Sequence, residues 1–260
     1  MTSLNVAPED NSVLSVFANL DLLLVSTGDG FYVPSYNVDQ IGEINQTDGF
    51  NVFLNGGDSQ VLSLDGSPVD ASQAITLEAY TMNLLPYLLQ DCMSTSDVFA
   101  GFEDNLLVVK SDNNEFYVPS FGVETLVEMC PGEAYAVFLN GGDDIEFTYP
   151  DGGVALGRTN MVDMDDYLSR TRTDMVPMTG ESHLILLSDI QGEVVVGDQL
   201  RAYAQDNLVG SINIVEEHIN GTHPVDLVAV GSVDYLSAYG GPELSGYSKG
   251  GSVQSCVFKN

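Results

Sequence analysis

Two runs of apolar and polar positions in the first 150 residues occur twice, in the same order. Phe31–Ser35 (FYVPS) returns as Phe116–Ser120, and Val52–Asp58 (VFLNGGD) returns as Val137–Asp143. In both cases the second copy follows the first by 85 positions. A constant separation over two motifs is typical of a duplicated unit. The duplicated residues are apolar and turn-forming, so the pattern predicts an architecture rather than a set of catalytic groups.

Each repeat begins with an apolar spacing that is typical of a helix. Ser12–Leu20 and Ser94–Phe102 place large apolar residues on one helical face, and each has a serine at its start that can act as a cap. The short apolar runs Leu22–Val25 and Leu106–Val109 follow, and they predict strands. A turn and the FYVP strand come next, so we expect a hairpin in each repeat.

Proline and glycine positions predict where the strands of the repeats end. Pro34 and Pro119 cannot donate a ladder hydrogen bond, which puts the end of each FYVP strand at an edge or a bend. The Asn-Gly-Gly-Asp sequences at 55–58 and 140–143 follow the last strand of each repeat. Because Asn and Gly adopt positive φ at low cost, these tetrapeptides predict turns with positive φ.

The composition and the pattern of apolar residues change after residue 150. Residues 151–166 are rich in Gly and Asp and predict a linker. Beyond Tyr167 the pattern is typical of an all-β domain with six short strands, which favours a sandwich or barrel. The expected strands are His183–Leu187, Glu193–Val196, Leu200–Ala204, Leu208–Val215, Asp226–Val230 and Val253–Phe258.

The sequence therefore predicts an α+β, mainly β fold. Two tandem repeats, each a short helix, a β-hairpin and a strand, precede a C-terminal β-sandwich-like domain. The expected boundaries are 1–75 for repeat module 1, 76–150 for repeat module 2, 151–166 for the linker and 167–260 for the C-terminal module.

The first repeat is expected to lack part of its opening strand. At the separation of 82 that relates the two predicted helices, Asn83 corresponds to Met1. An incomplete strand leaves an open sheet edge. We expect a neighbouring subunit to fill that edge by adding a strand.

The charge of the chain excludes two classes of partner. It carries 7 Lys and Arg against 38 Asp and Glu, a formal net charge of −31. Nucleic acid and anionic membrane surfaces are poor partners, because both are bound through clustered basic residues. No apolar run approaches the roughly 18 residues that span a bilayer, so no membrane insertion is expected. Met1–Ser15 lacks the pattern of a signal peptide, which predicts synthesis in a cytoplasm or a trimmed chain.

The three cysteines, Cys92, Cys130 and Cys256, match neither a zinc-ligand spacing nor a paired disulfide framework. In the first repeat the positions corresponding to Cys92 and Cys130 hold Asp10 and Asn45. No bridge is therefore common to the two repeats, and we expect free buried thiols.

The sequence predicts no catalytic, cofactor-binding or metal-binding residues. His183, His218 and His223 have no partners at metal-ligand spacing, and surface or turn positions are expected for them. No nucleophile elbow is expected, although Gly246–Gly250 (GYSKG) has the letters of Gly-x-Ser-x-Gly, and no phosphate-binding Gly-x-x-x-x-Gly-Lys loop occurs in the sequence.

The acidic turns leave one alternative open. Residues 112–115 and 143–144 carry Asp, Asn and Glu in turn composition, with Asp29 and Asp58 at the corresponding places of the first repeat. We expect these side chains to form turns, and no cofactor. The alternative is that some of their oxygen atoms bind calcium, although no EF-hand loop is present.

The second repeat resembles a known small module. The resemblance lies in Lys110 and Asp112, in Tyr117–Gly122 and in Ala134–Val137. Similar modules occur in secreted multidomain proteins of marine Bacteroidetes and in virion structural proteins of marine phages, including tailed cyanophages. Members of that family open with Gly-Trp-Asn, whereas here Thr81–Tyr87 fills the position without the Gly or the Trp.

The C-terminal part is similar to the module that commonly accompanies this repeat. The similarity lies in Thr179–His183, Val196–Leu200, Leu208–Gly210 and Gly246–Gly251. Together the two resemblances cover nearly the whole chain, and they imply no catalytic residues.

The resemblance implies a structural or adhesive role outside a cell or on a particle. Our first expectation is a non-enzymatic structural protein of a tailed-phage virion, as a capsid decoration, collar or tail appendage that contacts other virion proteins or copies of itself. The alternative is a secreted bacterial adhesion or carbohydrate-binding protein at the cell surface, with a host-surface glycan as partner. A hydrolase remains a third class, because acidic β-rich proteins often bind sugars.

Overall fold

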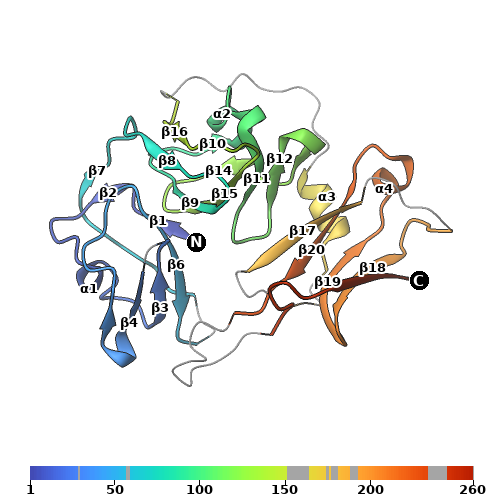
Figure 1. The fold of residues 1–260 in the computed structure, drawn as a ribbon, viewed down its shortest axis with the longest axis horizontal. Coiled ribbons are helices and arrows are strands. Elements are labelled where there is room, and N and C mark those ends of the chain that lie inside the picture. The colour runs from blue at the N-terminus through green and yellow to red at the C-terminus, as the bar shows by residue number, and fades with distance from the viewer. Residues whose placement is uncertain are drawn as a thin grey trace. The chain divides into compact units, whose positions relative to one another are not determined.

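The fold is mainly β, with several antiparallel sheets and a few short helices (Figure 1). The computed structural model describes residues 1–28, 30–56, 59–150, 164–173, 176, 181–187, 193–233 and 245–259. The chain divides into two compact units. The first comprises Met1–Ser111, Glu115–Ser120 and Leu126–Gly157, and the second comprises Asp112–Asn114, Phe121–Thr125 and Arg158–Asn260. Both predicted repeat segments therefore contribute most of their residues to one unit.

The first segment is organised around a five-stranded sheet of order β1-β6-β3-β4-β5, with antiparallel pairs throughout. Its strands are β1 (Thr2–Ser3), β3 (Leu22–Ser26), β4 (Phe31–Val33), β5 (Val38–Asp39) and β6 (Gly49–Leu54). The remaining elements are β2 (Val6–Ala7), which pairs with β7 (Ser67–Pro68), the helix α1 (Val13–Val16) and the 3₁₀ helix η1 (Pro34–Tyr36).

The second segment has a five-stranded sheet of order β9-β15-β11-β12-β13. Its strands are β9 (Met82–Pro86), β11 (Leu106–Lys110), β12 (Phe116–Val118), β13 (Val123–Glu124) and β15 (Ala134–Leu139). Around it lie α2 (Thr95–Val98), η2 (Glu103–Asn105), η3 (Pro119–Phe121), the pair β10 (Met93–Ser94) and β14 (Glu128–Met129), and the pair β8 (Ile75–Leu77) and β16 (Ile145–Phe147).

The two sheets agree in register as well as in strand order. In β3 the pairing with β6 shifts between Leu22 and Leu24. In β11 the pairing with β15 shifts between Leu106 and Val108. An irregularity of this kind inserts an extra residue and re-aims the strand. Both predicted hairpins, β3–β4 and β11–β12, are confirmed.

The two predicted helices are present but much shorter than Ser12–Leu20 and Ser94–Phe102. The Ser12 hydroxyl accepts a hydrogen bond from the Ser15 N–H, which confirms the expected cap. Each helix ends after one turn, because Phe17 and Phe99 already have non-helical backbone angles. One turn is enough to bury Val13 and Val16 of α1 and Val98 of α2, whereas Leu14 of α1 is exposed.

The proline prediction is confirmed and the glycine prediction only in part. β4 and β12 end at Pro34 and Pro119, and each proline begins a 3₁₀ turn. Gly56 has φ +98°, as expected, whereas residues 57 and 58 lie outside the described part of the chain. In the second segment the prediction of positive φ is wrong, because neither Gly141 nor Gly142 has a positive φ. A Cβ at Gly142 would lie 2.6 Å from the Tyr80 hydroxyl oxygen, at the end of an exposed side chain that can move aside.

The opening strand β1 joins the first segment to the second. It pairs with β6 on one side, and Thr2 forms a bridge with Glu133 on the other. The Ser3 N–H donates to the Gly132 carbonyl at 3.1 Å. The prediction of an edge open to a neighbouring subunit is therefore wrong at β1, because the chain itself supplies the partner.

Gly49, at the start of β6, lies close to the backbone of the second segment. A Cβ at Gly49 would lie 2.7 Å from Leu84 Cγ, 2.8 Å from the Leu84 carbonyl oxygen and 3.2 Å from Ala134 Cβ. Real Cβ atoms almost never approach other atoms below 3.0 Å. The absence of a side chain at Gly49 therefore lets β6 pack against the second segment.

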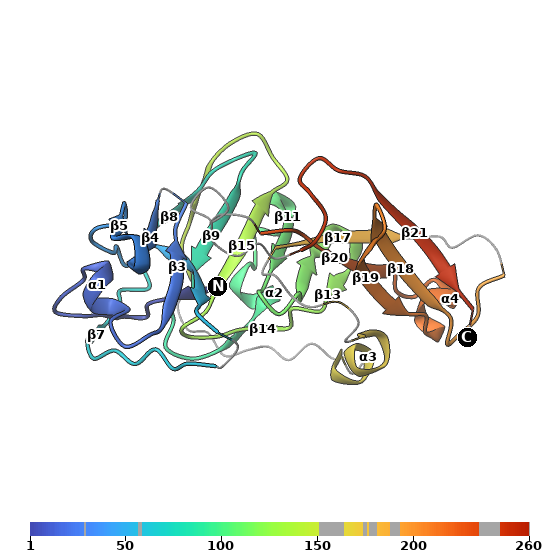
Figure 2. The same ribbon diagram turned by 90° about the horizontal axis from the view of Figure 1, so that it is seen from below.

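Among its described residues, the second unit has two small sheets and two helices. β17 (Ser182–Leu187) pairs with β20 (Val225–Val230), and Figure 2 shows β19 (Asn207–Asn213), β18 (Gln199–Ala204) and β21 (Val253–Phe258) side by side in a three-stranded sheet. The helices are α3 (Met164–Thr171) and α4 (Glu216–Asn220). Apolar residues of β18, β19 and β20 share one core: Leu200, Ala202, Ala204, Val209, Ile212, Val225, Leu227 and Ala229.

Five of the six strands expected after Tyr167 are confirmed, with shifts of one or two residues at their ends. Glu193–Val196 is wrong as a strand. The Val195 N–H donates to the Asp198 carboxylate and the Asp198 N–H donates to the Val195 carbonyl, so the segment forms a turn. The helices α3 and α4 also correct the all-β expectation. Most of the predicted linker, 151–163, lies outside the described residues, and its end belongs to α3.

We predict that Gly49→Ala lowers the free energy of unfolding by about 1–3 kcal/mol, because the added methyl group must displace the Leu84 backbone. The matched control is Gly28→Ala, where a Cβ meets no atom within 4 Å and φ is not positive. Chemical denaturation of the two variants measures the difference. Equal stability of both variants would show that β6 does not pack tightly on the second segment.

Candidate functional site

Three polar side chains meet in the interior of the second unit. Tyr167 on α3, His218 on α4 and Asp226 on β20 are 1%, 6% and 8% exposed. The Tyr167 hydroxyl oxygen lies 2.8 Å from His218 Nε2 and 2.5 Å from Asp226 Oδ1. A Tyr, a His and an Asp from three separate elements therefore form one hydrogen-bonded chain, which we call the Tyr167 cluster.

The backbone fixes the direction of the hydrogen bonds in this cluster. The Val215 N–H, at the start of α4, donates to His218 Nδ1 at 3.2 Å. Nδ1 is then an acceptor, so a neutral imidazole carries its proton on Nε2. Nε2–H donates to the Tyr167 oxygen, and the Tyr167 hydroxyl donates to the Asp226 carboxylate. Each polar hydrogen of the Tyr167 cluster thus has an acceptor.

Burial shifts the pKa values of all three groups. It raises the pKa of the Asp226 carboxyl, against the opposing effect of the Tyr167 hydrogen bond. Burial, followed by the Asp226 charge, raises the pKa of Tyr167 far above its ordinary range. Burial and then the neighbouring His223 lower the pKa of His218 to about 4. At neutral pH the cluster therefore holds a neutral imidazole and an intact phenol.

An ion pair and a second imidazole lie beside the cluster. Arg170 donates two hydrogen bonds to the Glu217 carboxylate, at 2.8 and 3.2 Å, and these lower the pKa of Glu217 to about 2. The ring centroid of His223 lies 4.7 Å from that of Tyr167. Within the described residues, His223 Nε2 is buried without a hydrogen-bond partner.

The three histidines differ from one another more than the sequence indicated. His218 is buried, so the prediction of a surface or turn position is wrong for it. His223 lies in the turn after α4, and His183 is exposed on β17, as expected. One signal was available in the sequence: Asp226 interrupts an otherwise apolar strand, and buried carboxylates need partners. The identity of those partners depends on tertiary contacts that the sequence does not give.

The chemistry open to the Tyr167 cluster is limited by its own bonds. The raised pKa of Tyr167 keeps its phenol protonated at neutral pH, and its oxygen takes part in two hydrogen bonds. Both ring nitrogens of His218 are engaged, and all three groups are buried. The arrangement is suited to fastening α3 and α4 to β20.

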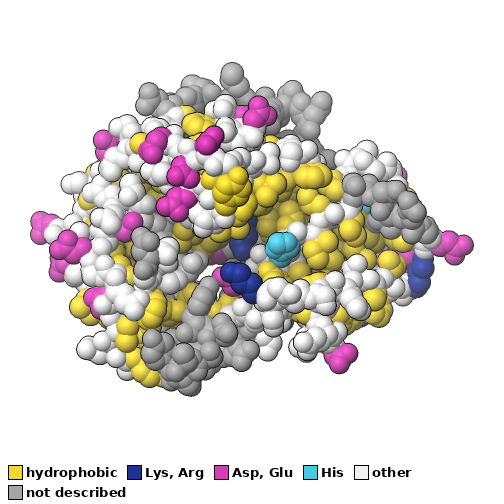
Figure 3. All heavy atoms as spheres, in the orientation of Figure 1, with side chains coloured by type: hydrophobic (Ala, Val, Ile, Leu, Met, Phe, Trp, Pro, Cys, Tyr) yellow, Lys and Arg dark blue, Asp and Glu magenta, His cyan; other side chains and the backbone are white. Residues whose placement is uncertain are grey.

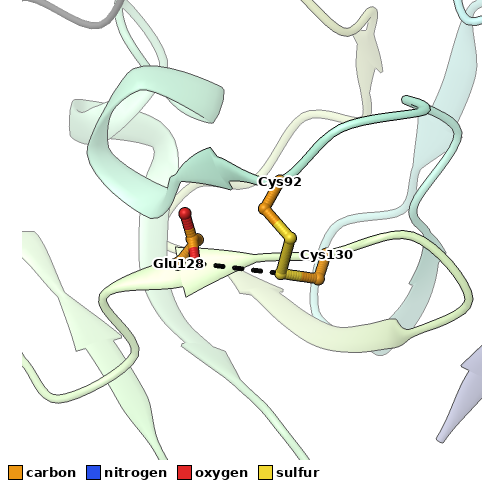
Figure 4. Close-up of side chains that lie close together, drawn as sticks. All are labelled: Cys92, Glu128 and Cys130. Carbon is orange, nitrogen blue, oxygen red and sulfur yellow. Dashed lines mark hydrogen bonds between the residues drawn. A yellow bond between two sulfur atoms is a disulfide. The ribbon is translucent and has the colours of Figure 1, made fainter.

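The expectation of free buried cysteines is wrong in two ways. Cys92 and Cys130 are joined in a disulfide with a Cα–Cα distance of 4.2 Å (Figure 4). Cys256 is free, but it is exposed on β21. The disulfide closes a sequence separation of 38 residues, which stabilises the fold by about 4 kcal/mol in the chain-entropy model. Because Asp10 and Asn45 replace this pair in the first segment, comparing the two repeats hid the bond.

Two carboxylates of the acidic turns, those of Glu115 and Asp144, accept hydrogen bonds within the fold. The Ser111 hydroxyl donates to Glu115 Oε2 at 3.0 Å and closes the turn between β11 and β12. The Ala79 N–H donates to Asp144 Oδ1 at 2.8 Å. Asp29 and Asp58 lie outside the described residues. Figure 3 shows acidic side chains at many separate points of one face rather than in a single patch.

No protein-family model matches this sequence, and no curated protein or solved structure matches it either. Every helix in the described residues is too short or too polar to cross a bilayer. Any conclusion about function therefore depends on the residues themselves.

We predict that Tyr167→Phe costs about 3 kcal/mol of unfolding free energy, because it leaves the buried Asp226 carboxylate and His218 Nε2–H without their partner. Tyr203→Phe on β18 is the matched control, since Tyr203 is half-buried in the same unit, and it should change stability by less than about 0.5 kcal/mol. Thermal or urea unfolding measures both. A Tyr167→Phe variant as stable as the parent would contradict the assigned hydrogen bonds.

The lowered pKa of His218 predicts a loss of stability in mild acid. The unfolded imidazole takes up a proton near its ordinary pKa of 6.5, whereas the folded one does so near 4. His218 therefore contributes stability above pH 6.5 that is lost as the pH falls toward 4. The raised pKa of Asp226 has the opposite effect on stability. As the pH falls, the folded carboxyl takes up its proton before the unfolded one does, and this increases the free energy of unfolding.

The contribution of His218 can be isolated by comparing two pH profiles. Between about pH 7 and about pH 5 the parent should lose roughly 2 kcal/mol more than His218→Gln does. Urea unfolding followed at several pH values gives both profiles. Parallel profiles of parent and variant would contradict the pKa assigned to the imidazole.

Proposed function

We propose that the chain is a non-enzymatic structural protein of a tailed-phage virion, a capsid decoration, collar or tail appendage that acts through protein–protein contacts. It consists of two tandem copies of one module and a C-terminal sandwich-like domain. Its partners are other virion proteins or copies of itself. The observation that carries the proposal is that the buried Tyr167, His218 and Asp226 side chains, whose pKa values are shifted by burial, are bonded to one another within the fold.

The duplication is supported by the agreement between the two five-stranded sheets. They have the same strand order, and the pairing of β3 with β6 shifts at the same place as that of β11 with β15. Phe17 and Phe99, at matching positions after α1 and α2, are both buried in the cores of their segments. The C-terminal sandwich is supported by the single core that β18, β19 and β20 share.

The non-enzymatic role is supported by how the candidate groups are used. A catalytic acid, base or nucleophile must reach a substrate, directly or through one water molecule. Tyr167, His218 and Asp226 are buried and bonded to one another. The carboxylates of Glu115 and Asp144 are bonded to the chain itself. What the molecule offers a partner is its surface.

The second candidate is a secreted bacterial adhesion or carbohydrate-binding protein at the cell surface. The Cys92–Cys130 disulfide favours it, because disulfides form and persist in oxidising surroundings outside the cytoplasm. A virion released from its host meets the same surroundings, so the bond is compatible with both candidates. The two differ in the object on which the chain is displayed.

Immunogold electron microscopy with antibodies against the purified chain separates the two candidates. Cells and particles from the source culture are labelled in parallel, and antibody pre-absorbed with the purified chain is the control. The proposal expects gold at repeated positions on tailed particles. Gold confined to the cell envelope would favour the adhesion, and gold confined to the cytoplasm of cells without particles would contradict both.

A further inference from the structure

We propose that Cys92, Cys130 and Glu128 form a binding site for Zn²⁺ when the two cysteines are reduced, so that a metal ion and the disulfide are alternative occupants of one place. The proposal concerns the second segment alone. Zinc binding by the reduced cysteines does not depend on the proposed function. The proposed function determines only when the protein meets reducing or oxidising surroundings.

The local ladder brings these three side chains to one side. In the β10–β14 pair, Met93 lies opposite Met129 and Ser94 opposite Glu128. Continuing this register by one residue sets Cys92 opposite Cys130. Alternate residues of a strand share a face, so Glu128 points to the same side as Cys130. Figure 4 shows the Glu128 carboxylate on the same side as the two sulfur atoms.

The three ligand atoms are close enough for one metal ion. The two sulfur atoms and a Glu128 carboxylate oxygen all lie within 4.8 Å of one another, and Cys130 Sγ lies 3.9 Å from Glu128 Oε2. In a tetrahedral zinc site with Zn–S bonds of about 2.3 Å, two sulfur atoms lie roughly 3.8 Å apart. Opening the S–S bond and moving the sulfur atoms apart by rotation of the side chains reaches that separation.

The donor set and its exposure fit zinc better than calcium or magnesium. Two thiolates and one carboxylate are ligands that zinc accepts, whereas calcium and magnesium prefer oxygen ligands alone. Cys92 and Glu128 are exposed and Cys130 is half-buried, so an ion can enter from solvent. Water can supply the fourth ligand.

The exchange between the two states balances with a dithiol as reductant. The Cys92–Cys130 S–S bond breaks and takes up two electrons and two protons, and the dithiol loses the same and becomes a disulfide. Zn²⁺ then binds the two sulfur atoms and displaces both thiol protons to solvent. For the return, an external disulfide accepts the two electrons from the thiolates, and Zn²⁺ is released.

The first segment shows that the ladder does not itself require a cross-link. There Ser12 and Glu43 form the corresponding bridge. Asp10 and Asn45 occupy the positions that match the two cysteines. Zinc or a disulfide would each close the same loop in the second segment, so the cross-link would be kept when the redox surroundings change.

Titration of the full chain with Zn²⁺ tests the site. The chain is reduced with tris(2-carboxyethyl)phosphine under anaerobic conditions, and binding is measured by competition with a chromophoric chelator. We expect the reduced chain to bind one zinc ion in competition with the chelator, and we expect the oxidised chain to bind none under the same conditions. Co²⁺ in place of Zn²⁺ should give the sulfur-to-cobalt charge-transfer band of a thiolate site.

Four variants assign the ligands. Cys92→Ser and Cys130→Ser should each weaken zinc binding by at least about 100-fold, and Glu128→Gln by about 10-fold. Cys256→Ser is the matched control, since Cys256 is an exposed free cysteine elsewhere, and it should bind like the parent.

Circular dichroism of each sample decides how a negative result is read. A reduced parent that keeps its fold and binds no zinc overturns the proposal, as does zinc binding of equal strength by Cys92→Ser or by the oxidised chain. If reduction unfolds the chain, recovery of the fold on adding Zn²⁺ supports the proposal, and failure to recover overturns it.

Discussion

The short strand β1 is the contact on which the first unit depends. Ser3 is almost fully buried, and its hydroxyl accepts a hydrogen bond from the Tyr87 N–H at 3.1 Å and donates to the Glu133 carbonyl at 2.5 Å. The same residue pairs with Gly49 of β6. A two-residue strand thus links a sheet of the first segment to the backbone of the second. Because unpaired buried backbone groups are costly, separating the segments would expose several at once.

Polar side chains elsewhere in the described residues also form hydrogen bonds within the fold. Ser12 and Ser94 cap one-turn helices, the Glu115 and Asp144 carboxylates close turns, and the Tyr167 cluster ties two helices to β20. These side-chain groups are bonded within the fold. This use of polar residues is what connects the architecture to the proposed role as a surface-presenting protein.

Features set by local sequence could be predicted, and features set by long-range register could not. The strands around Pro34 and Pro119 follow from apolar runs and from a residue that cannot donate a hydrogen bond. The helices are shorter than their apolar spacing indicated, since the backbone leaves helical angles at Phe17 and Phe99, whose side chains are buried. The Cys92–Cys130 bond depends on the β10–β14 register, and the partners of Asp226 depend on how α3 and α4 pack. Neither the disulfide nor the set of Asp226 partners produces a recognisable motif spacing in the sequence.

We expect β1 to make the two matched segments one cooperative unit. Native-state hydrogen exchange at increasing concentrations of guanidinium tests it most directly, because it gives the opening free energy of each strand separately. We predict that amides of β6 and β15 converge on one opening free energy. If β6 opened at much lower denaturant than β15, the segments would be independent domains and this account of the fold would be contradicted.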